Sequence, residues 1–265
     1  MKIIRNYCTK SDCYKAGKKI IVKGIMIHSV GCPQPKAQPF INNWNKAGAG
    51  ALAHAIIEPN GNVYQLLPWE RRGWHGGGTS NDKYIGVEMT EPSTIKYTSG
   101  SVWKETGDGK NTKKHVLATY EIAVELFAKL CKTYKLDPTK DGVIISHSEG
   151  HKRGIATNHG DVEHIWNKYG LTMKQFRKDV KKKMRSTDNK TPTTGYSSTG
   201  FKVKVEISNL NIRKGPGTDY AKTGKNTGTG IFTIVQTKKG KGSDKGWGKL
   251  KSGTGWISLD YVRRV

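Results

Sequence analysis

A short polar segment at residues 186–199, with the sequence STDNKTPTTGYSST, is the feature that most constrains how this chain folds. It contains Pro192 and Gly195 and offers almost no side chain for a hydrophobic core, which is typical of a linker. The composition differs on its two sides, and a chain of 265 residues is long enough for two ordinary domains. We therefore predict one domain at residues 1–185, a linker at 186–199 and a second domain at 200–265.

The pattern of apolar residues in the first region favours an α/β domain. β-Branched runs are typical of buried strands, and the Asn60-Gly61 pair is typical of a hairpin turn. Apolar side chains between residues 114 and 134 recur at steps of three and four, which is the period of a helix. We expect a central mixed sheet flanked by helices. Strands are predicted at residues 20–27, 51–57, 62–66, 84–89 and 142–146, and helices at 114–134, from 161 onward and at 173–184.

The second region, residues 200–265, is rich in glycine and contains short alternating runs such as KVKVEI and GIFTIVQ. Several short strands separated by glycine turns predict a small all-β barrel. The region carries fourteen basic and four acidic side chains, a net charge of +10, which leaves +15 for residues 1–199. The basic character therefore belongs to both parts of the chain.

The whole chain has 46 Lys and Arg residues against 21 Asp and Glu residues, a formal net charge of +25, which favours polyanionic partners. Binding of nucleic acid is a weaker interpretation, because the basic residues are dispersed rather than aligned along one element. No apolar run reaches the ~18–20 residues that span a bilayer, so we expect no membrane insertion. The first residues lack the apolar stretch of a secretory signal, so we expect synthesis in the cytoplasm.

The cysteines are too few for a disulfide scaffold and form no CxxC pair; they are Cys8, Cys13, Cys32 and Cys131. We expect all four to be reduced and non-catalytic. Cys32 lies four residues after His28, so a Cys–His nucleophile is an alternative to consider. It precedes Pro33 in an expected loop, and no strand-to-helix turn presents its thiol, which disfavours that alternative.

Two histidines are predicted at positions that favour a metal-binding or catalytic site. His28 and His147 each follow a strongly apolar strand, at the rigid rim of the expected sheet. The segment 146–166 adds three more histidines, two glutamates and one aspartate. Catalytic zinc usually takes three protein ligands, histidine or carboxylate, and leaves one position open. His28, His147 and either Asp161 or His159 would complete such a set.

The first region resembles the zinc-dependent N-acetylmuramoyl-L-alanine amidases of the peptidoglycan-recognition and phage lysozyme-amidase type. The matching motifs stand in the order of that family. They are GIMIHSVG (24–31), AHAIIEPNGNVYQLLP (53–68), GWHGGG (73–78), YIGVEMTEP (84–92), VIISHSEGH (143–151) and NHGDVEHIW (158–166).

This resemblance implies a role for several residues. It implies Zn²⁺ as the cofactor, with His28, His147 and Asp161 as its ligands, and Glu88 as the catalytic glutamate. The family usually has a lysine two positions before the last ligand, where this chain has His159. The departure leaves His159 as either an oxyanion-stabilising catalytic group or the third zinc ligand. Contacts to substrate are expected from four further residues: Trp74, His75, His151 and Lys152.

Residues 201–265 resemble the bacterial SH3-like modules that bind cell walls. The motifs that carry the resemblance are LNIRKGPGT (210–218) and WGKLKSGTGWISLDYV (247–262). The resemblance implies that Tyr220, Trp247 and Tyr261 contact the wall. The excess of lysine and arginine suits peptidoglycan threaded with anionic polymers.

Together these features predict a modular hydrolase of bacterial peptidoglycan that cuts the amide bond between N-acetylmuramic acid and L-alanine. A phage endolysin, released to the wall through a holin pore and acting as a monomer, fits this organisation. A host autolysin is the near alternative. A peptidoglycan-binding protein without activity is another, although it would be expected to lack a zinc ligand or Glu88.

Overall fold

The computed structural model describes residues 1–188 and 201–265, and the chain divides into two compact units, Met1–Asp188 and Asn189–Val265. The division falls within the segment predicted to be a linker, most of which lies outside the described residues. Within the described part of the chain, no helix combines the length and the apolar character needed to cross a membrane.

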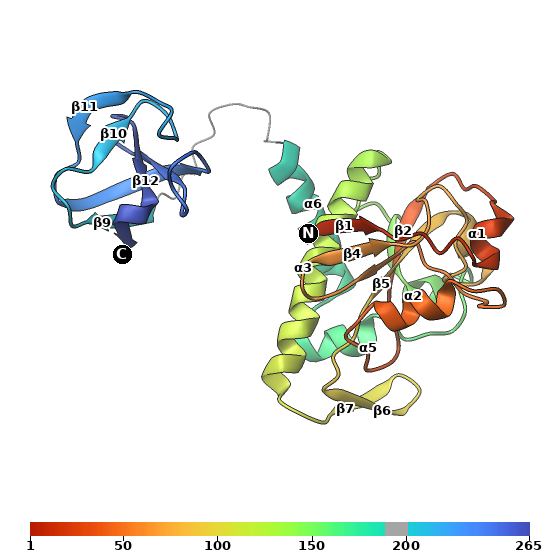
Figure 1. Cartoon of the computed structure of the whole chain (residues 1–265). Coiled ribbons are helices and arrows are strands. Elements are labelled where there is room, and N and C mark those ends of the chain that lie inside the picture. The colour runs from red at the N-terminus through yellow and green to blue at the C-terminus, as the bar shows by residue number, and fades with distance from the viewer. Residues whose placement is uncertain (189–200) are drawn as a thin grey trace. The chain divides into compact units, whose positions relative to one another are not determined.

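The first unit is built on a six-stranded mixed sheet in the order β1-β4-β3-β5-β2-β8 (Figure 1). The β3–β4 pair is antiparallel, as the Asn60-Gly61 turn predicted, and the other neighbours are parallel. Its elements are β1 (Lys2–Arg5), α1 (Asp12–Ala16), β2 (Gly24–Ser29), α2 (Gln38–Trp44), β3 (Ala55–Ile57), β4 (Asn62–Gln65), the 3-10 turn η1 (Gly78–Asp82), β5 (Tyr84–Met89), β6 (Ile95–Ser99), β7 (Val102–Glu105), α3 (Gly109–Thr133), β8 (Ile144–Ser146), α4 (His147–Lys152), α5 (Glu163–Trp166), η2 (Asn167–Tyr169) and α6 (Met173–Asp188).

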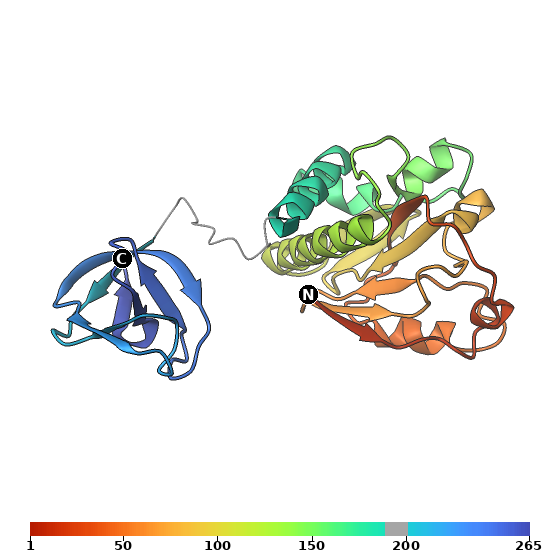
Figure 2. The same ribbon diagram turned by 90° about the horizontal axis from the view of Figure 1, so that it is seen from above.

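Helices cover both faces of this sheet (Figure 2). On one face α3 and α6 pack side by side over the inward side chains of β2, β3 and β5, among them Ile27, Ile57 and Val87. On the other face α1 and α2 pack against a smaller cluster around Leu52 and Ile56. Because side chains alternate along a strand, the second face also receives His28 and Glu88, which places polar groups beside this smaller core.

Several sequence-based boundaries needed correction. The strand predicted at 51–57 begins at Ala55, and the helix predicted at 173–184 ends at Asp188, inside the predicted linker. The strand predicted at 20–27 begins only at Gly24, opposite the first residue of β5, and Ile21 is 76% exposed. The long helix α3 begins five residues earlier than the predicted residue 114, because the Asp108 side chain accepts a hydrogen bond from the Lys110 amide and caps the first turn. The helix expected from Asp161 begins at Glu163.

The second unit contains one seven-stranded antiparallel sheet in the order β11-β10-β14-β13-β12-β9-β15. Its core is formed by apolar side chains from most of these strands, including Val205, Ile212, Ile234 and Ile257. The unit is therefore all-β, as its glycine-punctuated sequence predicted. Its elements are β9 (Phe201–Val205), β10 (Asn211–Arg213), β11 (Lys222–Asn226), β12 (Gly230–Lys238), β13 (Trp247–Leu250), β14 (Trp256–Ser258), η3 (Leu259–Tyr261) and β15 (Val262–Arg264).

Candidate active site

A cavity of about 690 Å³ lies where β2, β5 and β8 end, and the histidines singled out in the sequence gather in it. His28 comes from β2, His147 is the first residue of α4 directly after β8, and Asp161 lies in the loop before α5. All three side chains are at least nine-tenths buried. The cavity is therefore the meeting point of segments far apart in the sequence.

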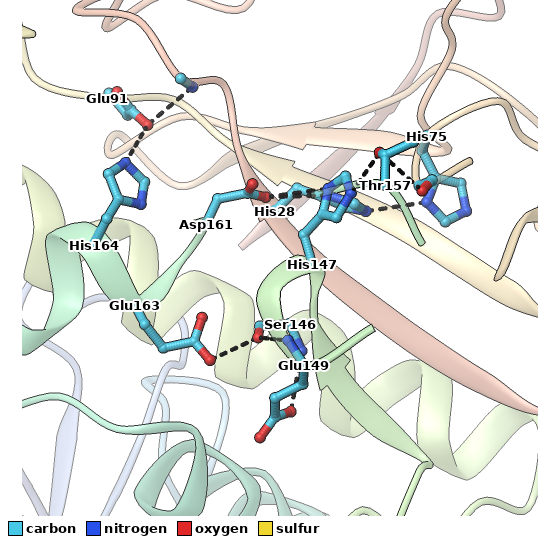
Figure 3. A network of polar contacts seen from close by, with 12 residues as sticks. His28, His75, Glu91, Ser146, His147, Glu149, Thr157, Asp161, Glu163 and His164 are labelled. Carbon is cyan, nitrogen blue, oxygen red and sulfur yellow. Dashed lines mark hydrogen bonds and ion pairs between the residues drawn. The ribbon is translucent and has the colours of Figure 1, made fainter. Parts of the chain in front are cut away.

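The potential ligand atoms of these three residues converge on one point (Figure 3). The Nδ1 atoms of His28 and His147 lie 3.0 Å apart. The Oδ2 atom of Asp161 lies 3.2 Å from Nδ1 of His28 and 3.7 Å from Nδ1 of His147. Two imidazole nitrogens and one carboxylate oxygen are a donor set that catalytic zinc uses in proteins. The residues present therefore fit a zinc ion, and Asp161, rather than His159, completes the set in this structure.

Strand register brings Glu88 to the same place. In the parallel ladder between β2 and β5, His28 pairs with Glu88. The buried Oε2 atom of Glu88 finds no hydrogen-bond partner among the described residues. Burial raises the pKa of Glu88 to about 7, with smaller contributions from the nearby carboxylates. An unpaired carboxylate with a pKa near neutrality is suited to accept and return a proton.

The electrostatics of the three ligand residues favour a bound cation. Burial lowers the pKa of His28, but the carboxylates of Glu88 and Asp161 outweigh burial and raise it above its ordinary value. Burial and the charge of His28 lower the pKa of His147 to about 4. Burial raises the pKa of Asp161, yet its hydrogen bond to His28 and both histidine charges leave the pKa below its ordinary value. The buried carboxylate of Asp161 therefore favours positive charge at this site.

The other residues expected at the site differ in whether they line the cavity. His159 lines the cavity, and its ring centroid lies 4.5 Å from that of His147. His75 also lines the cavity, but both of its ring nitrogens contact protein groups. Trp74 packs against the cluster beneath α1 and α2, and His151 and Lys152 are exposed on α4. The last three are not among the cavity-lining residues, and their contact with substrate stays a prediction.

The hairpin formed by β6 and β7 was not predicted from the sequence. It supplies Tyr97 and the turn residues Gly100 and Ser101 to the cavity wall. The Tyr97 hydroxyl donates to Oε2 of the buried Glu91 at 2.8 Å and lies 2.6 Å from Nε2 of His164. The Ser-Gly-Ser turn between two alternating runs was the available signal for this hairpin.

The four cysteines form no disulfide, and all lie within the described residues. Burial raises the pKa of the Cys32 thiol, and the neighbouring Glu91 raises it further. A nucleophilic cysteine needs the opposite shift, toward the thiolate. Cys32 is also not among the residues that line the cavity, so the electrostatics do not support the Cys–His alternative.

The second unit has a cavity of its own, of about 300 Å³. Asn209, Arg213, Trp247 and Tyr261 are among the residues that line it. The buried indole nitrogen of Trp247 has no hydrogen-bond partner within the described part of the chain. Tyr220, also expected at a binding surface, is 46% exposed and lies outside the lining.

Several solved structures resemble this chain in fold. Two of them are the Staphylococcus aureus hydrolase AmiA in complex with its ligand, with a TM-score of 0.53, 16% identity and coverage of 72% of this chain and 87% of that one, and PlyL, with a TM-score of 0.50, 16% identity and coverage of 69% and 99%. At this identity the likeness establishes the amidase-type arrangement of a mixed sheet with helices and no more.

Curated relatives and a family model give closer evidence. The 1,6-anhydro-N-acetylmuramyl-L-alanine amidase AmpD of Citrobacter freundii is 33% identical over 78 residues, which cover 26% of this chain and 39% of that protein. AmpD of Escherichia coli strain K12 is 32% identical over 75 residues, which cover 26% and 40%. The matched stretch spans about two fifths of these relatives. The family model for N-acetylmuramoyl-L-alanine amidase matches residues 17–163, more than half of the chain. The matched range includes His28, Glu88, His147 and Asp161. The chain therefore belongs to the N-acetylmuramoyl-L-alanine amidase family.

Proposed function

We propose that this chain is a zinc-dependent amidase that hydrolyses the bond between N-acetylmuramic acid and L-alanine in bacterial peptidoglycan. One observation carries the proposal. In a member of this amidase family, three buried candidate ligand atoms lie within 3.7 Å of one another and share a cavity with Glu88, whose Oε2 atom has no hydrogen-bond partner in the described part of the chain. That arrangement combines a metal site with a proton acceptor, the two elements that amide hydrolysis by water requires.

The roles of the residues follow from their positions. His28, His147 and Asp161 would hold zinc, which when bound supplies Lewis acidity toward the amide carbonyl and makes the attacking water more acidic. Glu88, which lines the cavity, would take a proton from water and deliver it to the departing nitrogen. His159, beside His147 at the cavity wall, would donate a hydrogen bond to the oxygen that gains charge. The products are a carboxylate on muramic acid and a free amino group on L-alanine.

We assign wall binding to the second unit. Its cavity is lined by a tryptophan, an arginine and an exposed tyrosine, groups that suit a polar and partly anionic polymer. A catalytic unit joined to a wall-binding unit is the organisation expected of a phage endolysin. We therefore propose host lysis as the biological role.

Mass spectrometry of digested walls tests the reaction. Purified peptidoglycan treated with the protein is expected to release stem peptides with a free L-alanine amino terminus, and a chelator is expected to stop the release until zinc is restored. New reducing sugar ends, or new amino termini at other residues, would contradict the proposed bond. Binding to walls with no cleavage by the zinc-supplied protein would favour a recognition protein instead.

A further inference from the structure

Each histidine of the candidate zinc site has a second ring nitrogen that contacts a residue outside the ligand set (Figure 3). Nε2 of His28 lies 3.0 Å from Nδ1 of His75. Nε2 of His147 lies 3.0 Å from Oγ1 of Thr157. In both cases Nδ1 faces the point where the ligand atoms converge. The question is which of the two nitrogens carries the proton.

For His28, the position of the ring proton follows from a main-chain carbonyl. Nε2 of His75 lies 3.0 Å from the carbonyl oxygen of Tyr84, which can only accept a hydrogen bond. Nε2 of His75 must therefore carry its proton, and in the neutral ring Nδ1 of His75 is left as an acceptor. That acceptor requires the proton of His28 on Nε2. In the neutral ring Nδ1 of His28 is then the nitrogen without a proton, which is the form that binds a metal; in the metal-free protein a proton added at Nδ1 is donated to Asp161.

A second carbonyl acts in the same way on His147. The hydroxyl of Thr157 donates to the carbonyl oxygen of Gly76 at 3.3 Å. Because a hydroxyl has one proton, Oγ1 of Thr157 then accepts from Nε2 of His147. Nδ1 of His147 is again left without a proton. Gly76 follows His75 directly, so both chains of hydrogen bonds pass through the GWHGGG segment.

Two glycines make room for these contacts. A Cβ atom on Gly86 of β5 would lie 2.2 Å from Cγ of His75, so only glycine lets the ring lie over the strand. A Cβ atom on Gly77 would lie 2.7 Å from Cγ2 of Thr157, and Gly77 has a φ of +69°. Glycine at positions 77 and 86 therefore leaves space for the side chains of Thr157 and His75.

We propose that His75 and Thr157 are positioning residues that set the proton placement of the two histidine ligands and so present both Nδ1 atoms to the metal. The inference rests on the zinc site proposed above, and it gives the GWHGGG segment a role within the protein itself. Residues that orient metal ligands in this way typically contribute about 10–100-fold to metal affinity.

Zinc affinity, measured by competition with a chromogenic chelator, tests the assignment in the full chain. His75→Phe keeps a ring but removes the acceptor, and Thr157→Val keeps the shape but removes the hydroxyl. Each is expected to weaken zinc binding by about 10–100-fold. His75→Asn retains an acceptor near the position of Nδ1 and is expected to bind more tightly than His75→Phe. Thr119→Val is the matched control, because the Thr119 hydroxyl bonds to the carbonyls of its own helix, at His115 and Val116, and it should leave the affinity unchanged.

A second measurement does not depend on the variants. Long-range ¹⁵N–¹H spectra of the zinc-loaded wild-type protein are expected to place single ring protons on Nε2 of His28, His75 and His147. A proton on Nδ1 of His75 would overturn the inference, and so would wild-type zinc affinity in both His75→Phe and Thr157→Val. A wild-type protein that binds no zinc would instead overturn the metal site itself.

Discussion

At the scale of single residues, Glu88 stands out because its Oε2 atom has no hydrogen-bond partner among residues 1–188 and 201–265. Its Oε2 atom is buried beside His28, and burial raises the pKa of the group to about 7. Evolution of a stable core alone would not favour such a group, since burying an unpaired carboxylate costs free energy. Proton transfer during hydrolysis, the role proposed for Glu88, would account for such a group in the cavity.

Replacing Glu88 with glutamine should separate catalysis from metal binding. Loss of the general base is expected to reduce kcat by about 10²–10⁴-fold, with zinc affinity close to that of the wild type. Release of L-alanine amino termini from soluble muropeptides measures the rate. Glu121→Gln, on the exposed side of α3, is the control and should keep full activity. Near-normal turnover in Glu88→Gln would exclude Glu88 as the base.

The same substitution should change how the metal-free protein responds to pH. The pKa of Glu88 is raised from 4.5 to about 7 on folding, so the folded protein holds its proton more tightly and loses stability as pH rises through this interval. Metal-free Glu88→Gln should therefore gain in Tm relative to the wild type between pH 4.5 and 7, with little difference below pH 4.5. An equal Tm difference at every pH would contradict this account.

At the scale of elements, the β6–β7 hairpin forms one wall of the cavity and is held by polar contacts. The Trp103 indole donates to the carbonyl of His164 at 2.9 Å, and the Lys168 ammonium lies 4.6 Å from the centre of the Trp103 ring. The hairpin turn packs closely on Gly160, where an added Cβ atom would lie 2.4 Å from Oγ of Ser101. Gly160 precedes Asp161, so the hairpin also confines a candidate metal ligand.

This packing predicts that Gly160→Ala disturbs the site and that Ser101→Gly repairs it. Gly160 has no positive φ, so lack of space rather than backbone conformation opposes the larger side chain. Overpacking of this kind costs about 1–3 kcal/mol. Gly160→Ala is expected to lower both Tm and kcat/KM, and the double variant Gly160→Ala with Ser101→Gly to recover most of each. A double variant no better than Gly160→Ala alone would refute the contact.

At the scale of the whole molecule, each unit has its own hydrophobic core. The larger core of the first unit contains side chains from the sheet and from α3, α5 and α6, and the core of the second contains only side chains from residues after 200. Both units are basic. Independent cores indicate that each unit can fold without the other.

We expect residues 1–188 alone to fold and to cleave soluble muropeptides at the full-length rate. On intact walls they should be slower, because a tethered binding unit raises the effective concentration and can add about 10²–10⁴-fold in avidity. Co-sedimentation with purified walls across a salt series measures binding of each unit, and electrostatic attachment should weaken as salt increases. Failure of the isolated second unit to sediment, with full binding of the first at high salt, would show that targeting belongs to the first unit.

The sequence by itself determined the features that depend on interactions between residues close together in the chain. The β3–β4 hairpin, strand β5, helix α3 and the placement of His28 and His147 by apolar strands follow from local periodicity and turn chemistry. The choice of Asp161 over His159 and the pairing of His28 with Glu88 were decided by strand register and loop path, which depend on contacts between residues more than 50 positions apart. The support of His28 by His75 also required tertiary structure, because only packing of the GWHGGG segment against Gly86 brings the two rings together.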